Sequence, residues 1–251
     1  MHFLMNKLFL AFSLSVLLLA NCNMAQAQNK AQEVSKAGEN KIEARAAAET
    51  QASSNGGAEK TNKEGEINMK TALLIIDVQN DYFPGGKMEL NNALDASVKI
   101  KSLLEHFRSK SMPVIHVQHI SDRPGSTFFL PRTSGVEIHG NVKPKSEEKV
   151  IVKHFPNSFR ETELNDYLKK NNISKLVIVG MMTHMCVDTT VRAAFDSGYD
   201  CIVAGDCCAT RNLSINDKKI AAEDVQNSFL AALNGIFAKV LKKDEVIELF
   251  K

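Results

Sequence analysis

The chain has 251 residues, of which 44% are hydrophobic and 24% are charged, and its formal net charge is +2. This composition is typical of one ordinary globular domain with an additional segment. The 31 basic residues nearly balance the 29 acidic ones, and no local cluster of lysine and arginine stands out. Nucleic-acid binding is therefore not expected.

The first 27 residues have the features of an export signal. Lys7 gives a weakly positive start, residues 8–20 form a short apolar run, and residues 25–27 (Ala-Gln-Ala) form a small-residue cleavage site. The run is too short to cross a bilayer, which takes about 20 apolar residues. We therefore expect residues 1–27 to be a signal peptide, and the mature protein to be periplasmic or secreted without stable membrane insertion.

A lipoprotein signal is the alternative interpretation of the same segment. Residues 19–22 (Leu-Ala-Asn-Cys) resemble the lipobox before a lipid-modified cysteine, which would place a lipid anchor on Cys22. Asn21 occupies a position where the lipobox has a small residue, so cleavage after Ala27 is preferred.

Residues 28–68 form a second segment of distinct composition. They are rich in Ala, Glu, Lys, Asn, Gln and Ser and contain no aromatic residue. Such a segment buries too little apolar surface to offset the entropy of ordering. We expect a disordered linker over 28–68 and one folded domain over 69–251.

Four cysteines remain after the predicted cleavage: Cys186, Cys201, Cys207 and Cys208. Export would place them in an oxidising compartment. Their spacing matches neither a disulfide framework nor a zinc site, because C-x-x-C pairs are missing. We expect free thiols.

From residue 69 onward, strand and helix patterns alternate. Strands are predicted at 72–76, 114–117, 150–152, 176–179 and 201–204, with an edge strand at 236–241. Helices are predicted at 94–108, 161–169, 221–233 and 244–250, and a further helix follows Cys186. Apolar strands joined by helices predict an α/β fold, a three-layer Rossmann-like sandwich with a mostly parallel six-stranded sheet.

Polar side chains gather where the predicted strands end. Asp77 follows the first strand, Lys153 the third, and Cys186 lies just beyond the fourth, while His119 and Asp206 end the second and fifth. In such sheets ligands bind outside the carboxyl ends of the strands. A carboxylate, an amine and a thiol are therefore expected at one edge, although each taken singly is compatible with a turn, a solvated strand end or a buried structural cysteine.

These three residue types suit acyl transfer. Cys186 falls in the first turn of a helix, where unpaired N–H groups favour a thiolate, and a nearby ammonium lowers a thiol pKa further. The Asp77 carboxylate can take the thiol proton and return it to a leaving amine. Backbone N–H groups between strand and helix can stabilise a developing oxyanion.

Three motifs, IIDVQNDYF with Asp77, KHFPNSF with Lys153 and GMMTHMCVDTTVRAA with Cys186, resemble the isochorismatase-like cysteine hydrolases. That family includes nicotinamidases, N-carbamoyl-amine amidohydrolases and isochorismatases, and the resemblance covers residue 69 to the end. It implies a catalytic triad of Asp77, Lys153 and Cys186. It also implies a cis peptide bond between Met181 and Met182, with the N–H groups of Met182 and Cys186 forming the oxyanion hole.

The resemblance also indicates which cofactors and which substrates are not expected. Nicotinamidases of this family usually have an Asp-x-His metal cluster after the second strand, whereas residues 116–122 here offer His116, His119 and Asp122 without that motif. We expect neither a metal nor another cofactor, although His116 and Asp122 leave a metal conceivable. The retained thiol favours an amide-like bond over a vinyl ether.

The loop over residues 121–140 is long for a compact domain and is expected to act as a lid or to pack against another subunit. The predicted substrate-binding residues flank the triad motifs and are Gln79, Phe83, His119 and Phe155. His184 is expected either to line the pocket or to have no role beyond the start of the helix. A homo-oligomer is expected from the resemblance.

The sequence therefore predicts a metal-free cysteine hydrolase that cleaves a small carboxamide or ureido C–N bond through a thioester. The alternatives are an isochorismatase-type vinyl ether hydrolase and a non-catalytic exported module that binds a small molecule. A redox protein using Cys186 with Cys207 or Cys208 is disfavoured because C-x-x-C is missing.

Overall fold

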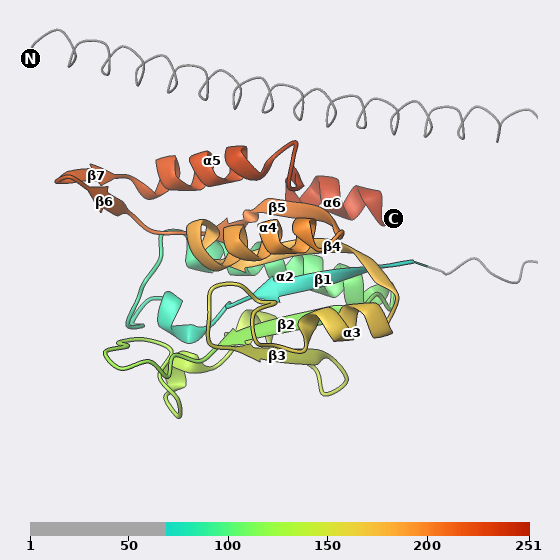
Figure 1. The fold of residues 1–251 in the computed structure, drawn as a ribbon, viewed down its shortest axis with the longest axis horizontal. Helices are drawn as coiled ribbons and strands as arrows, with labels where there is room; N and C mark the ends of the chain where they lie inside the picture. The colour runs from blue at the N-terminus through green and yellow to red at the C-terminus, as the bar shows by residue number, and fades with distance from the viewer. Residues whose placement is uncertain (1–68) are drawn as a thin grey trace, which may run out of the picture. The chain divides into compact units, whose positions relative to one another are not determined.

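The computed structural model describes residues 69–251. The predicted signal peptide (1–27), the linker (28–68) and Cys22 lie outside the described residues. Six parallel strands form one sheet, with helices on both faces, which confirms the predicted α/β sandwich (Figure 1).

The strands of the sheet run in the spatial order β3-β2-β1-β4-β5-β8. Their bounds are β1 Lys70–Ile76, β2 Val114–His119, β3 Lys149–Lys153, β4 Ile173–Met181, β5 Asp200–Ala209 and β8 Lys239–Leu241. The helices are α2 Ala93–Ser109, α3 Leu164–Lys170, α4 Asp188–Asp196, α5 Ala222–Leu233 and α6 Lys243–Leu249. Short 3-10 turns occur at η1 Asn80–Tyr82, η2 Ser134–Val136 and η3 Gly140–Val142, and a π-helical turn, η4, at Thr183–Val187.

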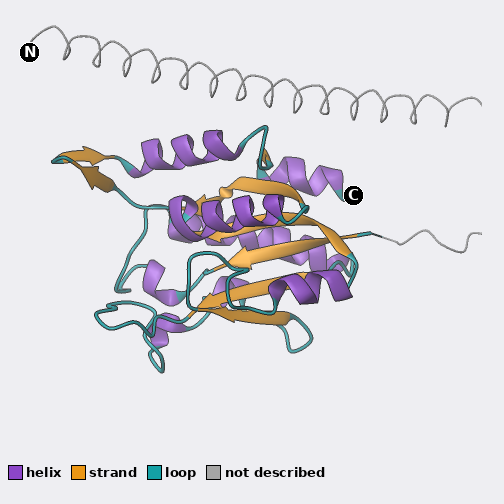
Figure 2. Ribbon diagram, in the orientation of Figure 1, coloured by secondary structure: helices purple, strands orange, loops and turns teal. Residues whose placement is uncertain are grey.

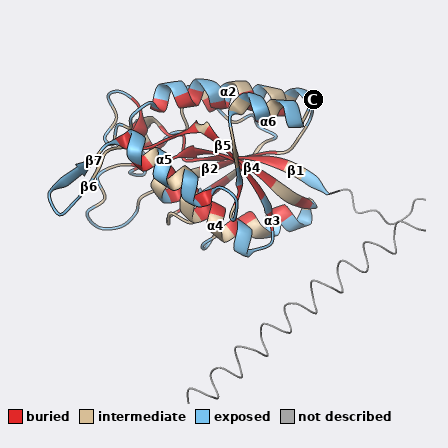
Figure 3. Ribbon diagram, turned by 90° about the horizontal axis from the view of Figure 1, so that it is seen from above, coloured by how far each residue is buried: buried red, intermediate tan, exposed pale blue. Residues whose placement is uncertain are grey.

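The core has two layers, one on each face of the sheet. Alternate side chains of β1, such as Leu73 and Ile75, pack under α2 and α6, while Leu74 and Ile76 pack under α3 and α4. Both faces of the central strands are buried, which explains their continuous apolar sequence. Figure 3 shows α2 with α6 on one side of the buried sheet and α3 with α4 on the other.

The connection order creates a switch point in the middle of the sheet. After β1 the chain moves outward through β2 to β3, then returns to place β4 on the other side of β1. Crossovers that leave in opposite directions open a crevice at the carboxyl ends of the two central strands. Asp77 follows β1, and the turn with Cys186 follows β4, so the fold places both at this crevice.

The structure differs from the sequence prediction most at β5. That strand continues to Ala209 instead of ending at Ala204, and its pairing with β4 is interrupted before it resumes at Gly180↔Cys208 and Met181↔Ala209. Gly205 and Asp206 suggested a strand end, but they lie inside this irregular stretch.

Smaller differences concern the short elements. Helix α3 begins at Leu164 instead of residue 161, because the Thr162 hydroxyl accepts a hydrogen bond from the Leu164 N–H at 3.3 Å. A two-stranded hairpin was not predicted; it comprises β6 Leu213–Ile215 and β7 Lys218–Ile220 (Figure 2). On α4, Phe195 is 41% exposed and packs against Phe237.

Among the described residues, no helix combines the length and apolar character needed to cross a membrane. The four cysteines of this region are buried and unpaired, which confirms the prediction of free thiols.

Candidate active site

The structure brings the three predicted catalytic residues together. The Lys153 ammonium lies 2.8 Å from Oδ2 of Asp77, and both side chains have no exposed surface. Asp77, Cys186 and His119 each offer an atom to a group whose members all lie within 4.8 Å of one another. Cys186 is 3% exposed, so the nucleophile is buried with the ion pair.

Asp77 is positioned by the backbone at the end of β1. It adopts a left-handed conformation with φ 51°, which aspartate tolerates better than most residues, and its N–H bonds to the Val117 carbonyl at 3.0 Å. Gly180 lets β4 pass closely at this point, because a Cβ there would overlap the backbone of Ile76. The close approach brings the turn after β4 next to Asp77.

Lys153 reaches the carboxylate from two strands away. It ends β3 and lies in register with His119 of β2, which in turn lies beside β1. Its ammonium also donates to the Pro156 carbonyl at 2.9 Å. A buried ammonium therefore has both a counter-charge and a fixed acceptor.

Cys186 lies in the π-helical turn that leads into α4, and the preceding bond between Met181 and Met182 is cis, as the resemblance implies. The Met182 carbonyl accepts from the N–H groups of Met185 (3.0 Å) and Val187 (3.3 Å). The Cys186 N–H, which lies between these two donors in sequence, does not bond to the Met182 carbonyl. Among the turn and cap hydrogen bonds of the described residues, none has the Met182 or the Cys186 N–H as its donor, and their assignment to an oxyanion hole stays a prediction.

The charges of the site differ from the expectation of a thiolate. Burial raises the pKa of the Cys186 thiol well above its usual value, the Asp77 charge raises it further, and Lys153 only partly opposes them. Burial would also raise the pKa of Asp77, but Lys153 and His119 outweigh it and the net direction is down. Burial alone would lower the pKa of Lys153, whereas Asp77 and Cys186 raise it overall. The resting site is therefore a carboxylate, an ammonium and a neutral thiol, because desolvation exceeds the helix and lysine effects.

Gln79 was predicted to bind substrate, but its amide is already occupied. Its Oε1 accepts from the His119 N–H, and its Nε2 donates to the carbonyls of His119 and Val136, each at 2.8 Å. These bonds fix the end of β2, and the substrate contact of Gln79 stays a prediction. They hold the His119 ring with Nδ1 3.8 Å from Oδ2 of Asp77.

Aromatic rings from the long loop cover this end of the sheet. Phe129 has no exposed surface, its centroid lies 4.6 Å from that of Tyr82 and 6.0 Å from that of His119, and its N–H donates to Asp81. This part of the loop is therefore packed as a wall of the site. The lid role of residues 121–140 stays a prediction.

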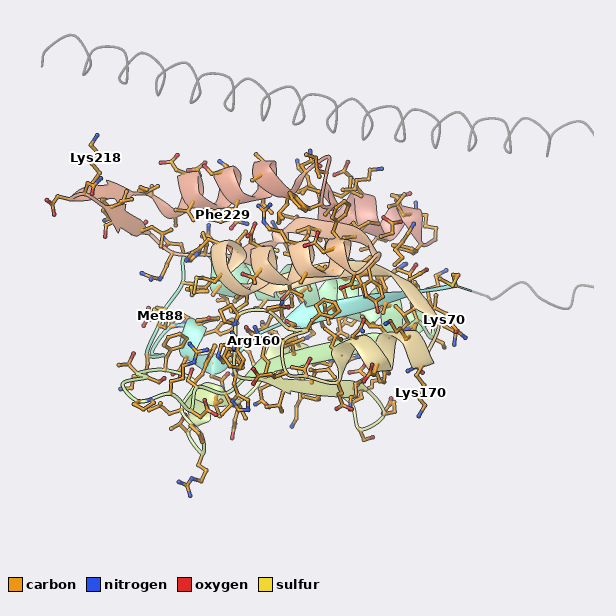
Figure 4. All side chains as sticks on the ribbon, in the orientation of Figure 1. Lys70, Met88, Arg160, Lys170, Lys218 and Phe229 are labelled. Carbon is orange, nitrogen blue, oxygen red and sulfur yellow. The ribbon has the colours of Figure 1, made fainter. Side chains whose placement is uncertain are left out.

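The other two predicted substrate contacts lie at the margin. Phe83 stacks on His139, with centroids 3.6 Å apart, and the ring of Phe155 contacts the guanidinium groups of Arg123 and Arg160. Arg160 can be found at the carboxyl end of the sheet in Figure 4, opposite Lys70 at the start of β1. Both aromatic contacts stay predictions.

The structure separates the two residues considered for a metal. His116 is buried and bonds Glu148 at 3.0 Å, whereas Asp122 pairs with His154 at 3.1 Å on the surface. The group of Asp77, His119 and Cys186 has ligand-type atoms, but the Lys153 ammonium already lies against the carboxylate. A cation bound there would compete with this ammonium, so the donor set does not fit a resident metal. Asp206 was predicted to end the fifth strand but lies inside β5, and it pairs with Lys99 at 3.3 Å outside the triad.

Two residues near the site were not singled out from the sequence. Tyr82 lies in the IIDVQNDYF motif and is 1% exposed, and Arg211 follows the extension of β5. The available signal for Tyr82 was its position inside a motif that carries the family resemblance. Arg211 carried no signal, because the strand before it was expected to end at Ala204. His184 Nδ1 contacts the Thr210 hydroxyl at 2.6 Å, one residue before Arg211.

Comparison with known proteins agrees with this architecture. A model of the isochorismatase domain matches residues 71–245. The chain is 54% identical over 172 residues to the uncharacterised isochorismatase family protein YddQ of Bacillus subtilis, covering 68% of this chain and 96% of that protein. It is 29% identical over 162 residues to the ureidoacrylate amidohydrolase RutB of Caulobacter segnis, covering 51% of this chain and 68% of that protein.

A solved structure shows the same fold. It is described as an isochorismatase hydrolase from Oleispira antarctica and superposes with a TM-score of 0.69 at 42% identity, covering 76% of this chain and all of that one. The chain therefore belongs to the isochorismatase family of hydrolases.

Proposed function

We propose that this hydrolase is a metal-independent amidohydrolase that cleaves the C–N bond of a small carboxamide or ureido compound through a thioester on Cys186. The observation that carries the proposal is the Cys186 thiol beside a fully buried carboxylate–ammonium pair. A thiol in this setting needs a base within reach, and Asp77 is ionised and adjacent.

The proposed reaction begins with proton transfer from Sγ of Cys186 to the Asp77 carboxylate. The sulfur then attacks the substrate carbonyl carbon, and the N–H groups of Met182 and Cys186 donate to the oxyanion. Asp77 returns its proton to the departing nitrogen, which leaves as ammonia or an amine. Asp77 next takes a proton from water, whose oxygen attacks the thioester, and the proton returns to sulfur as the acid product leaves.

In this scheme Lys153 stabilises negative charge and takes no part in making or breaking bonds. Its ammonium balances the negative charge of Asp77 before proton transfer and of the thiolate after it. Because both charges lie in a site without solvent, the ammonium keeps the two states close in energy.

Hydrolysis of a vinyl ether would leave some groups of this site without a function. Hydrolysis of a vinyl ether has no evident need for a sulfur nucleophile, whereas an amide carbonyl accepts one directly. A non-catalytic binding module would not need a buried base and ammonium next to the thiol. The amidohydrolase named among the relatives adds support for C–N cleavage.

Ammonia release from a small library of primary amides and ureido compounds tests the proposal. We expect turnover in the wild-type protein, none in Cys186→Ala, and unchanged turnover in Cys201→Ala, which removes a buried thiol on β5 away from the triad. Mass spectrometry of the protein during turnover should show an acyl adduct on Cys186. Turnover that survives Cys186→Ala excludes the mechanism.

We also propose that the domain works outside the cytoplasm after loss of residues 1–27, and as a homo-oligomer. The signal-like sequence supports the first point and the family resemblance the second. Cell fractionation with mass measurement of the exported N-terminus tests the first, and analytical ultracentrifugation of residues 69–251 tests the second.

A further inference from the structure

Helix α5 contacts the turn that carries the predicted oxyanion donors through one buried hydroxyl. Thr183 is the first residue of η4, lies between Met182 and Cys186 in sequence, and has no exposed surface. Its hydroxyl lies 2.6 Å from Oε1 of Gln226 on α5 and 3.2 Å from the Ala209 carbonyl of β5. A hydroxyl has one proton to donate, so the shorter bond to Gln226 is the main anchor of this residue.

The other end of the Gln226 amide bonds to the irregular stretch of β5. Its Nε2 donates to the carbonyls of Gly205 at 3.1 Å and Cys208 at 3.2 Å. The pairing of β5 with β4 is interrupted after Val203 and resumes at Cys208, so these carbonyls border the interruption. A flipped amide would turn its oxygen toward two carbonyl oxygens, so its orientation is fixed. One amide therefore joins the irregular part of β5, helix α5 and the turn after β4.

A second contact from α5 supports the next residue of the turn. The His184 ring meets the ring of Phe229 edge-on, with centroids 5.9 Å apart, and its Nδ1 lies 2.6 Å from the Thr210 hydroxyl. Phe229, labelled on α5 in Figure 4, follows Gln226 by three positions, so the two side chains lie on the same face of the helix. Two consecutive residues of η4 are therefore supported by one face of α5, outside the triad.

The turn depends on such support because its predicted donors are backbone groups. The N–H groups of Met182 and Cys186 move with the backbone, and no side-chain rotation can realign them. Oxyanion donors must lie about 2.7–3.1 Å from the developing charge, and a misplacement of about 1 Å costs about 100-fold in rate. Thr183 follows Met182 directly, so a displacement of Thr183 also moves the backbone of Met182.

We propose that Gln226 is a positioning residue for the oxyanion hole, which acts through Thr183 on the N–H groups of Met182 and Cys186 and does not touch the substrate. The inference rests on the proposed function, which assigns the oxyanion to these two groups. Loss of Gln226 should lower kcat and leave KM unchanged, because the oxyanion forms only after the sulfur attacks.

The first test measures the thiol and the oxyanion hole in one assay without turnover. Iodoacetamide alkylates Cys186 with loss of iodide and a proton, and it forms no oxyanion. Butanal instead adds reversibly to the thiol: the S–C bond forms, the carbonyl oxygen becomes an oxyanion that accepts from the two N–H groups, and the sulfhydryl proton passes to Asp77. The butanal concentration that halves the alkylation rate, followed by peptide mass spectrometry at Cys186, measures this adduct.

The side chains of the proposed link should affect the butanal adduct and not the alkylation. We expect Gln226→Leu to raise the half-protecting concentration of butanal by about 10-fold or more, while the alkylation rate without butanal stays within about threefold of wild type. Thr183→Val should give the same rise, and Thr183→Ser, which keeps the hydroxyl, should restore most of the protection. Asn227→Leu is the control, because it removes an exposed amide from the next position of α5.

Three results of this assay overturn the proposal. The first is equal half-protection of wild type and Gln226→Leu, and the second is a wild-type thiol that butanal does not protect. The third is an alkylation rate in Gln226→Leu that falls as much as its butanal binding, because the thiol itself has then moved. If Gln226→Leu does not fold, Thr183→Val against Thr183→Ser decides, and equal half-protection of these two overturns the proposal.

The second test is steady-state ammonia release from the best amide of the library. We expect Gln226→Leu and Thr183→Val each to lower kcat by about 10- to 100-fold with KM within about threefold of wild type. The double variant should be no slower than the slower single variant, because both changes remove one link.

The outcomes of the two tests separate this inference from the proposed function. An unchanged kcat in Gln226→Leu, or a loss confined to KM, overturns the positioning role and leaves the amidohydrolase standing. A butanal adduct that depends on Gln226, in a wild-type protein without turnover, supports the positioning role and counts against the amidohydrolase.

Discussion

The Lys153 ammonium and the Asp77 carboxylate form an ion pair of 2.8 Å in which neither side chain has exposed surface. The two charges cancel, so ionisation of Cys186 at rest would leave a net negative charge without solvent. Desolvation therefore keeps the thiol protonated, and the base must act when the substrate is present. In the proposed mechanism, the nucleophile is therefore activated by its neighbour Asp77 rather than by a lowered thiol pKa.

Replacing the base should stop the reaction while leaving the nucleophile. We expect Asp77→Asn to lower kcat by about 10²- to 10⁴-fold, because proton transfer from sulfur is lost. The measurement is steady-state ammonia release on the best amide from the library. Asp122→Asn is the matched control, since Asp122 is an exposed carboxylate that pairs only with His154. Asp77→Asn within threefold of wild type would exclude Asp77 as the base.

Lys153 should matter for folding as well as for turnover. Lys153→Met leaves a buried carboxylate without its partner, which costs about 3 to 5 kcal/mol of unfolding free energy. Urea denaturation at pH 7 measures the loss. Lys149→Met removes a surface partner of Glu163 from the same strand and should cost at most about 1 kcal/mol.

The double variant makes this prediction specific to the pair. Asp77→Asn combined with Lys153→Met removes both charges, so its loss of stability should be smaller than the sum of the two single losses. Additive losses would show that the two residues contribute independently.

Much of this site could be predicted from the sequence alone. Continuous apolar strands indicate a parallel sheet, and the ends of such strands share one edge, which is why Asp77, Lys153 and Cys186 could be grouped. Their protonation states could not be predicted, because they depend on burial. The sequence indicates a helix start next to Cys186, whereas the structure shows that its side chain and its base are desolvated.

The hydrogen bonds of Gln79 and the position of Arg211 near the site could not be predicted from the sequence, for different reasons. Gln79 makes its hydrogen bonds to β2 and to residue 136, contacts 40 and 57 positions away that no local pattern encodes. Arg211 follows a strand whose irregular middle, around Gly205, has the composition of a loop.

Gln79 should influence activity through His119. Gln79→Leu removes three hydrogen bonds and leaves the His119 backbone groups unpaired, which should cost about 2 to 4 kcal/mol of stability and lower kcat more than it raises KM. Gln118→Leu is the control, because Gln118 donates to the same Val136 carbonyl but does not bond His119. Equal kinetic effects of the two variants would contradict a positioning role of Gln79.

The cluster around Glu148 should set the response of the fold to acid. Hydrogen bonds from Arg108, the Lys145 N–H and His116 overcome burial and hold the pKa of Glu148 at about 2, below its ordinary 4.5. A lowered pKa in the folded state adds stability above the unfolded value, and this stability is lost as pH falls from about 4.5 through about 2. The contribution at pH 7 is about 2 to 3 kcal/mol.

Glu148→Gln should therefore lose most of that stability at pH 7 and much less near pH 2.5. Urea denaturation at pH 7, 4 and 2.5 measures the difference between the variant and the wild type. Glu147→Gln, at an exposed neighbouring carboxylate, should follow the wild-type curve at each pH. A Glu148→Gln loss that is the same at all three pH values would show that the carboxylate contributes by packing, since a titrating ion pair must weaken as the carboxylate takes up its proton.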